Sequence, residues 1–339
     1  MKLQILVPQY EETDQVIKPL LDSIAVQQNV NFDEISVIIC SDGGKVLLSK
    51  GLLNSYPFNV EYHICEEKGV SATRNACLDK ATADYIMFCD ADDMFYHCCA
   101  LYVIFREMQG EGFNAFVSAF MEEGRTNDTK DIVYSIRGEV IKLPNGQQNG
   151  NVDVTFVHGK IYRRQYLIDK NIRWNDSLTI HEDSYFNCLA LQLTEKEKIK
   201  YSPAPFYLWK WRDNSVCRHD PKYILKTYNN MLDSNTALIN EFIARCKDET
   251  AQFYCTSMIY DAYFTMNKKE WINQDNREYR DNTERRFKKY FTDFVNVYSN
   301  TPETVKQQII MGIKNRMFKE GMFLEIVTFD DWIKHIMEL

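Results

Sequence analysis

Short apolar runs alternate with helical patterns along the N-terminal part of the chain. Four of these runs have the length and composition of buried strands, at residues 3–7, 35–40, 59–65 and 86–89. Between the first two, apolar residues recur at helical spacing over residues 16–24, and we expect that helix to begin near Pro19. A further helix is expected from an N-cap at Ser71 through Thr82. The order strand, helix, strand predicts the opening of a parallel α/β sheet.

The pattern changes near Asn114. Three segments alternate as antiparallel strands do, at residues 116–121, 132–141 and 152–162, and a short helix is expected over 163–170. Another helix opens at residues 181–183. Beyond residue 220 the spacing is helical over 223–247, 249–268, 282–299 and 304–318. We therefore expect an α/β domain over residues 1–219 and a helical C-terminal domain over residues 220–339.

Composition places the chain among globular proteins, because 45% of its residues are hydrophobic and 26% are charged. No apolar segment approaches the length that crosses a bilayer, and the apolar run at the N-terminus is too short for a signal peptide. A cytoplasmic location is therefore expected. The cysteines agree with it, because no Cys-x-x-Cys pair occurs and several thiols lie inside apolar patterns, as small hydrophobes do.

The net charge of −8 is unlike that of nucleic-acid-binding proteins, which normally carry a basic excess. Residues 285–290, Arg-Arg-Phe-Lys-Lys-Tyr, nevertheless form a local basic patch. Such a run is most often the solvated face of a helix, and the alternative is a surface for an anionic partner. A nucleic-acid partner is not expected, but the patch leaves it open.

Three carboxylates, those of Asp90, Asp92 and Asp93, are crowded into four positions after the fourth strand. Such groups repel one another unless a cation lies among them, and a divalent metal ion prefers oxygen ligands of this kind. The alternative is an acidic turn whose aspartates cap a helix that starts near Met94. This stretch alone leaves both interpretations open.

Polar residues also follow the ends of other predicted strands. Asp42 follows the second strand, Arg74 lies on the helix after the third, and Asp90 follows the fourth. The ligand of an open α/β sheet lies outside the carboxyl ends of its strands. We therefore expect these side chains to meet at one ligand site.

Seven motifs resemble, in order, the landmarks of family 2 glycosyltransferases: Val7-Pro8-Gln9-Tyr10, Ser41-Asp42-Gly43-Gly44, Gly69-Val70-Ser71-Ala72-Thr73-Arg74-Asn75, Asp90-Ala91-Asp92-Asp93, Gly159-Lys160-Ile161-Tyr162-Arg163, Glu182-Asp183 and Trp209-Lys210-Trp211-Arg212. The resemblance implies the GT-A fold, a Rossmann-like nucleotide-binding mixed sheet with flanking helices. It covers the chain before residue 220, and the helical C-terminus adds nothing to it. The motif at residues 41–44 departs from the Asp-Asp-Gly-Ser type of element that is more common in the family.

The resemblance also implies a site for a nucleotide-sugar donor, built from Pro8, Tyr10, Glu11, Asp42, Arg74, Asp90, Ala91, Asp92 and Arg212. In family terms, Asp42 would hydrogen-bond the base, usually uracil, and Arg74 would lie over the base or the diphosphate. Asp90 would face the ribose, and Arg212 would lie near the leaving diphosphate.

The remaining roles implied by the resemblance are catalytic. Asp183 would be the base that takes the proton of the acceptor hydroxyl. Asp92 would bind the Mn²⁺ or Mg²⁺ ion that bridges the diphosphate, with His219 as a further metal ligand. Asp93 receives no role.

The chemistry fits this assignment. A nucleoside diphosphate gathers negative charge as it leaves, and a divalent cation and an arginine stabilise that charge where it develops. A carboxylate that takes the acceptor's proton makes the hydroxyl a better nucleophile, and one displacement from the opposite face inverts the sugar. The first hypothesis is an inverting, metal-dependent glycosyltransferase that uses a UDP-sugar and acts on a glycan, a wall polymer or a lipid-linked acceptor.

Three alternatives remain open from the sequence. The same donor chemistry could glycosylate a modified base of DNA. A nucleotidyltransferase would also bind a nucleotide and a metal, but it would want a Gly/Lys-rich phosphate loop near the N-terminus, and the sequence has none. A non-catalytic sugar-binding module is disfavoured, because uncompensated carboxylates in a binding site are costly.

Overall fold

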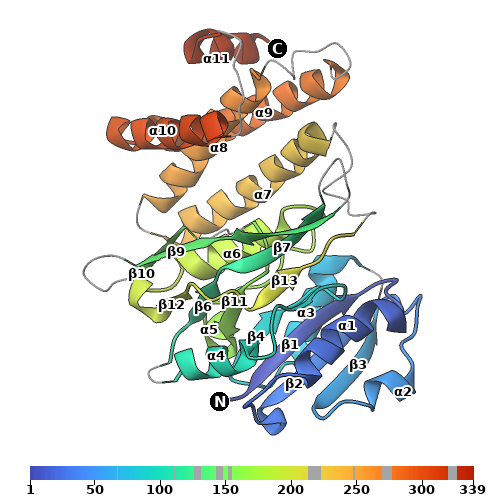
Figure 1. The fold of residues 1–339 in the computed structure, drawn as a ribbon. Coiled ribbons are helices and arrows are strands. Elements are labelled where there is room, and N and C mark those ends of the chain that lie inside the picture. Colours follow the sequence, from blue (N-terminus) through green and yellow to red (C-terminus); the bar gives the residue numbers. More distant parts are fainter. Residues whose placement is uncertain are drawn as a thin grey trace. The chain divides into compact units, whose positions relative to one another are not determined.

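The computed structural model describes residues 1–66, 68–109, 112–125, 131–142, 148–151, 155–212, 223–246, 249–268, 277–319 and 327–339. The chain divides into two units, Met1–Ser215 and Val216–Leu339. Figure 1 shows the sheets in the first unit and helices α7 to α11 in the second. The predicted boundary between residues 219 and 220 lies outside the described residues and stays a prediction.

A seven-stranded sheet of order β12-β6-β11-β4-β1-β2-β3 forms the centre of the first unit. Its strands are β1 (Leu3–Gln9), β2 (Ile35–Asp42), β3 (Asn59–Cys65), β4 (Tyr85–Phe88), β6 (Ala115–Ser118), β11 (Lys160–Arg163) and β12 (Ile199–Ser202). Neighbouring strands are parallel except at β11, which runs antiparallel to β4 and β6. The parallel sheet predicted for the first four strands is confirmed.

Helices cover both faces of this sheet, which explains why its strands are continuous apolar runs (Figure 1). α3 (Val70–Lys80) packs on β1 and β2, and α1 (Asp14–Ala25) lies on the other face. Four side chains of α1 enter the main buried cluster: Ile17, Leu20, Leu21 and Ile24. The expectation that this helix begins near Pro19 is wrong, because the helix begins at Asp14. Burial of the four aliphatic side chains offsets the one backbone hydrogen bond that a proline cannot donate.

Two further local predictions are wrong. The N-cap of α3 is Gly69 and not Ser71, and its φ of 90° is a conformation that glycine adopts without strain. Met94–Phe95 forms strand β5 instead of the start of a helix, because it pairs with β13 (Tyr207–Trp209). The aspartates before Met94 therefore do not cap a helix there.

A second sheet has the order β5-β13-β7-β8, with β7 (Phe120–Arg125) and β8 (Ile132–Arg137). β9 (Glu139–Lys142) and β10 (Gln148–Asn151) form a separate antiparallel pair. Within the described part of residues 152–162, only the stretch in β11 is a strand. Gly159 turns the chain before it with a φ of 70°, and a Cβ there would lie 2.6 Å from the backbone oxygen of Ser118.

Short helices complete the first unit: α2 (Lys50–Leu53), α4 (Ala100–Glu107), α5 (Arg164–Asp169) and α6 (Glu182–Gln192). The helices predicted at residues 163–170 and after 181 are confirmed. α6 is anchored by Phe186, whose ring stacks on Trp174 with 4.3 Å between centroids and meets Phe88 of β4 edge-on. This packing fixes the first turn of α6 beside the end of β4.

The second unit contains α7 (Tyr223–Arg245), α8 (Thr250–Met266), α9 (Arg277–Ser299), α10 (Glu303–Lys319) and α11 (Phe329–Glu338). The four helices predicted beyond residue 220 are confirmed, and α11 is an addition. Its Trp332 is 2% exposed and packs on Phe287 of α9, with 5.0 Å between ring centroids. Among the described residues, no helix has the length and apolar character of a membrane span.

The basic patch lies on α9, and three of its four basic side chains have partners within the second unit. Arg286 pairs with Asp233, and Lys289 pairs with Asp293 one turn along the same helix. The Lys288 ammonium donates to the backbone oxygen of Met337 at 2.9 Å. These contacts favour a solvated helix face over a surface for an anionic partner.

Candidate active site

Polar side chains gather at the carboxyl ends of β1, β2 and β4, which are parallel neighbours in the main sheet. Asp42 is the last residue of β2, and Asp90 follows β4 after one residue. The first turn of α6 adds Glu182 and Asp183. The fold thus brings together residues that are far apart in the sequence.

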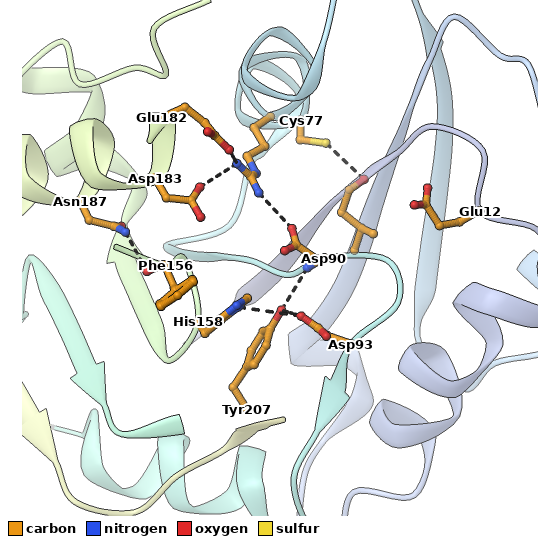
Figure 2. A network of polar contacts seen from close by, with 12 residues as sticks. Glu12, Cys77, Asp90, Asp93, Phe156, His158, Glu182, Asp183, Asn187 and Tyr207 are labelled. Atoms are coloured by element: carbon orange, nitrogen blue, oxygen red, sulfur yellow. Dashed lines mark hydrogen bonds and ion pairs between the residues drawn. The ribbon is translucent and has the colours of Figure 1, made fainter. Parts of the chain in front are cut away.

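Arg74 is the centre of this group. Its guanidinium donates to Asp183 Oδ1 at 2.8 Å, to Glu182 Oε1 at 3.0 Å and to Asp90 Oδ1 at 3.0 Å. Figure 2 shows the three carboxylates turned toward one another around these contacts. The Arg74 side chain is 3% exposed, and its guanidinium lies 4.5 Å from the ring centroid of Trp174. Burial opposes its charge, but the three carboxylates outweigh burial and raise the pKa of Arg74.

Asp183 lies in surroundings that disfavour its ionised form. Burial raises the pKa of its carboxyl group to about 8, against the effect of Arg74 and with a contribution from Glu182. Arg74 engages Oδ1, and no described residue donates a hydrogen bond to Oδ2. A carboxylate with one oxygen held and the other available has the geometry of a general base.

Asp90 and Asp92 differ in their surroundings. Burial opposes the ionisation of Asp90, but Arg74 outweighs it, so that the pKa of Asp90 is lowered. Asp92 Oδ2 pairs with Arg212 Nε at 2.7 Å. Burial and the neighbouring Asp90 raise the pKa of Asp92 to about 6. An added cation would therefore favour the ionised form of Asp92 more than that of Asp90.

Glu12 is a member of the site that the sequence did not single out. Its Oε1 lies 3.5 Å from Arg212 Nη1, and its Oε2 accepts from the backbone N–H of Tyr10 at 2.8 Å. The predicted Glu11 is exposed instead. Both glutamates follow β1, and no sequence signal separates them, because the direction of each side chain depends on the turn of the loop.

The residues predicted to hold the base lie at the ends of β1 and β2. Asp42 accepts hydrogen bonds from the backbone N–H groups of Lys68 at 2.8 Å and of Gly69 at 3.0 Å. It therefore fixes the segment that leads into α3. Tyr10 is exposed beside Lys45, and Pro8 is half-buried. Their contacts with a base stay a prediction.

Asp93 is more deeply buried than Asp90 and Asp92, the other two carboxylates of its loop. Its Oδ2 accepts from the Tyr207 hydroxyl at 2.6 Å, and its Oδ1 accepts from the backbone N–H of Lys210 at 2.9 Å. The same hydroxyl accepts from the backbone N–H of Asp90 at 3.1 Å (Figure 2). Burial, with Asp92 and Asp90, raises the pKa of Asp93.

Residues 4–169 match the model of the family described as Glycosyl transferase family 2. The chain contains a family 2 glycosyltransferase domain. Two curated proteins are similar to it in sequence. The minor teichoic acid biosynthesis protein GgaB of Bacillus subtilis (strain 168) is 23% identical over 215 residues, which cover 62% of this chain and 23% of that protein. The poly(ribitol-phosphate) beta-glucosyltransferase of Bacillus spizizenii (strain ATCC 23059 / NRRL B-14472 / W23) is 26% identical over 223 residues, with 62% and 32% covered. The chain thus spans only a minor part of these two relatives.

The glycosyltransferase domain and the helices after it also match solved structures. The crystal structure of S. aureus TarS 1–349 has a TM-score of 0.61 at 15% identity and covers 98% of this chain and 95% of that chain. The TarS 1–349 complex with UDP-GlcNAc has a TM-score of 0.59 at 16% identity and covers 98% and 95%. The GT-A fold followed by a helical region, as expected from the resemblance, is confirmed.

The residues of the glycosyltransferase domain fit a divalent metal ion. Asp90, Asp93 and His158 each offer a ligand atom within 4.8 Å of the others, and these atoms could hold an ion. Both Asp93 oxygens already accept hydrogen bonds, whereas Asp92 meets a half-exposed arginine. Carboxylate oxygens suit Mg²⁺ and Mn²⁺. His219, the other predicted ligand, lies outside the described residues, and its role stays a prediction.

Proposed function

We propose that the chain is an inverting, metal-dependent glycosyltransferase that moves a sugar from a UDP-sugar to the hydroxyl of an acceptor. The observation that carries this proposal is the bridge made by Arg74, which contacts Asp183 at 2.8 Å and Asp90 at 3.0 Å. Through it, the proposed base and the first carboxylate of the donor loop are held by a single buried cation.

Asp183 is the proposed base. Its Oδ2 would accept the proton of the acceptor hydroxyl while Arg74 holds Oδ1 in place. Arg74 also favours the ionised form that this step requires, because it opposes the effect of burial on the pKa of Asp183. Attack from the face opposite the leaving diphosphate then inverts the anomeric carbon.

Asp92 and Arg212 are the proposed ligands of the metal and the diphosphate. The nucleobase of the donor is proposed to lie among Pro8, Tyr10, Glu11 and Asp42. Asp92 would hold Mn²⁺ or Mg²⁺ together with His219, and the ion when bound would neutralise charge on the diphosphate. Arg212 is 49% exposed and has room to turn from Asp92 toward a diphosphate oxygen. Arginine suits this task because its planar fork matches two phosphate oxygens.

The relatives bear on the choice of substrates. One is named for teichoic acid biosynthesis and the other as a glucosyltransferase of poly(ribitol phosphate), which favours a wall polymer as acceptor. TarS has been solved with UDP-GlcNAc, which favours a UDP-sugar donor. The intramolecular partners of the α9 patch leave DNA with little support. The cytoplasmic location expected from the sequence stays a prediction that cell fractionation would check.

Asp183→Asn tests the proposal. The amide cannot take a proton, so transfer should fall by about a hundredfold or more, while the affinity for the donor stays within about twofold. A radiolabelled UDP-sugar panel with teichoic acid acceptors measures transfer, and calorimetry with UDP and Mn²⁺ measures binding. Glu182→Gln is the matched control, because Glu182 contacts the same guanidinium.

Transfer at the wild-type rate by Asp183→Asn would show that the base is another group. Loss of transfer in Glu182→Gln alone would move the assignment to Glu182. An NMR spectrum of the product tests inversion, since a retained anomeric configuration contradicts a single displacement. If no nucleotide sugar binds or reacts with the wild-type protein, the proposed function itself is wrong.

A further inference from the structure

Asp93 is the most deeply buried carboxylate of its loop. Its side chain is 1% exposed, compared with 33% for Asp90 and 17% for Asp92. Both of its oxygens already accept hydrogen bonds within the chain. We therefore expect Asp93 to affect a donor through the residues that it binds.

The partners of Asp93 come from a distant part of the sequence. The Tyr207 hydroxyl donates to Asp93 and accepts from the backbone N–H of Asp90, so it ties both ends of the Asp90–Asp93 loop to β13. The backbone N–H of Lys210 donates to the other Asp93 oxygen. The Asp93 carboxylate thus joins two distant segments through two hydrogen bonds. The bond with Tyr207 spans 114 residues of the chain, and the bond with Lys210 spans 117.

We call the hydrogen bonds among Asp93, Tyr207, Lys210 and the Asp90 backbone the joint between the Asp90–Asp93 loop and β13. β5 and β13 are paired at Tyr207 with Phe95 and at Leu208 with Met94, and the Tyr96 N–H donates to the Phe206 oxygen at 2.8 Å. Beyond that pair, the Asp93 side chain replaces the ladder and holds Lys210. Two residues later, Arg212 Nε meets Asp92 Oδ2 at 2.7 Å. Along the chain, Asp93 is adjacent to Asp92, and Lys210 lies two residues before Arg212.

We propose that Asp93 and Tyr207 are positioning residues that hold Asp92 and Arg212 at the separation required to bind the metal and diphosphate of the donor. This inference rests on the proposed function, because it takes Asp92 and Arg212 as donor ligands. It assigns no direct ligand contact to either residue. Its consequence is selective, since the proposed contacts to the nucleobase come from the ends of β1 and β2, which do not contact Asp93 or Tyr207 through the hydrogen bonds described above.

The first test compares two tyrosines. Tyr207→Phe removes the hydroxyl that serves Asp93 and Asp90, and Tyr166→Phe removes a buried hydroxyl that donates to the backbone oxygen of Ala190 at 2.7 Å. Tyr207→Phe should weaken the binding of UDP with Mn²⁺ by about tenfold, because buried polar partners lose their hydrogen bonds. The affinity for uridine, which lacks the diphosphate, should fall much less. Tyr166→Phe should leave both affinities unchanged, while thermal unfolding reports the stability lost by each variant.

The second test separates the hydrogen bond from the charge. Asp93→Ala and Asp93→Asn both remove the carboxylate, but the Asn oxygen can still accept from Lys210. Asp93→Asn should therefore recover most of the UDP affinity that Asp93→Ala loses. The donor KM should follow the same order in the transfer assay.

The outcomes distinguish the two proposals. If wild-type protein binds UDP with Mn²⁺ and Tyr207→Phe behaves like Tyr166→Phe, the inference is wrong and the proposed function stands. Equal loss of UDP and uridine affinity would show general damage to the fold, and this also overturns a positioning role. Equal affinities in Asp93→Ala and Asp93→Asn would show that charge acts in place of the hydrogen bond. If the wild-type protein does not bind UDP with Mn²⁺, both proposals fail.

Discussion

Arg74→Gln should destabilise the first unit strongly, because Arg74 is the cation shared by three carboxylates. The contacts at 2.8, 3.0 and 3.0 Å all come from one guanidinium that is almost completely buried. Removing one partner from a buried ion pair costs about 3–5 kcal/mol, since the remaining charge is left uncompensated. Asp90 keeps partial contact with solvent, so we expect the lower end of this range, about 3 kcal/mol.

The loss should depend on pH in a definite direction. Without Arg74, the native pKa of Asp183 rises further above that of the unfolded chain, and Asp90 loses the cation that lowers its native pKa. A carboxyl group with a raised native pKa gives up stability as the pH increases from its unfolded pKa through its native pKa. Asp90 adds to the difference above its lowered wild-type pKa, and Asp183 adds to it as the pH approaches its wild-type pKa of about 8. The difference between variant and wild type should therefore be larger at pH 8 than at pH 5.

Urea unfolding at both pH values measures this difference, and Arg173→Gln is the control. Arg173 pairs with Asp79 at 2.6 and 2.9 Å, but both side chains are largely exposed. Its loss should cost at most about 1 kcal/mol at either pH. Equal free energies of unfolding for the two variants would refute the reasoning that the buried charges of the site depend on Arg74.

Three further predictions follow from the same structure. The rate of transfer should rise about tenfold per pH unit below about 8 and then level off, because Asp183 must be ionised to act as base; a rate that is flat from pH 6 to 9 would contradict this. Asp92→Ala should abolish the increase in UDP affinity that Mn²⁺ produces in calorimetry, and an unchanged response to the metal or to EDTA would remove Asp92 from the metal site. Trp332→Ala should destabilise the second unit by about 3–5 kcal/mol in urea unfolding, because it empties the space between α9 and α11; a change below about 1 kcal/mol would show that α11 does not depend on this side chain.

Most of the fold was predictable because the apolar pattern is strong where strands and helices are buried. β3 lies at the residues expected from its pattern, and the helices of the second unit follow their spacing. The wrong predictions lie where contacts between residues distant in sequence determine the local secondary structure. Met94–Phe95 is a strand because β13 pairs with it. In the described part of residues 152–162 the strand begins only at Lys160, because Gly159 turns the chain close to Ser118.

The sequence predicted which residues meet at the site. It predicted less well which hydrogen-bond partners each of these residues has. Strand ends indicated Asp42, Asp90 and Asp92, since parallel strands present their carboxyl ends at one edge. The partners of Asp93 could not be predicted, because Tyr207 is distant in sequence and carries no motif of its own. Glu12 was not predicted for a similar reason. The packing of the loop after β1 determines which of its two glutamate side chains points toward Arg212.

The two hydrogen bonds that Asp42 accepts from Lys68 and Gly69 have a consequence for the kinetics of binding. They shape the start of α3 through contacts made within the chain. Ordering a loop on binding costs about 1–2 kcal/mol per residue in backbone entropy, and a segment ordered beforehand escapes that cost. Encounter with a nucleotide should then be a single-step process at this segment, with an observed rate that rises linearly with nucleotide concentration.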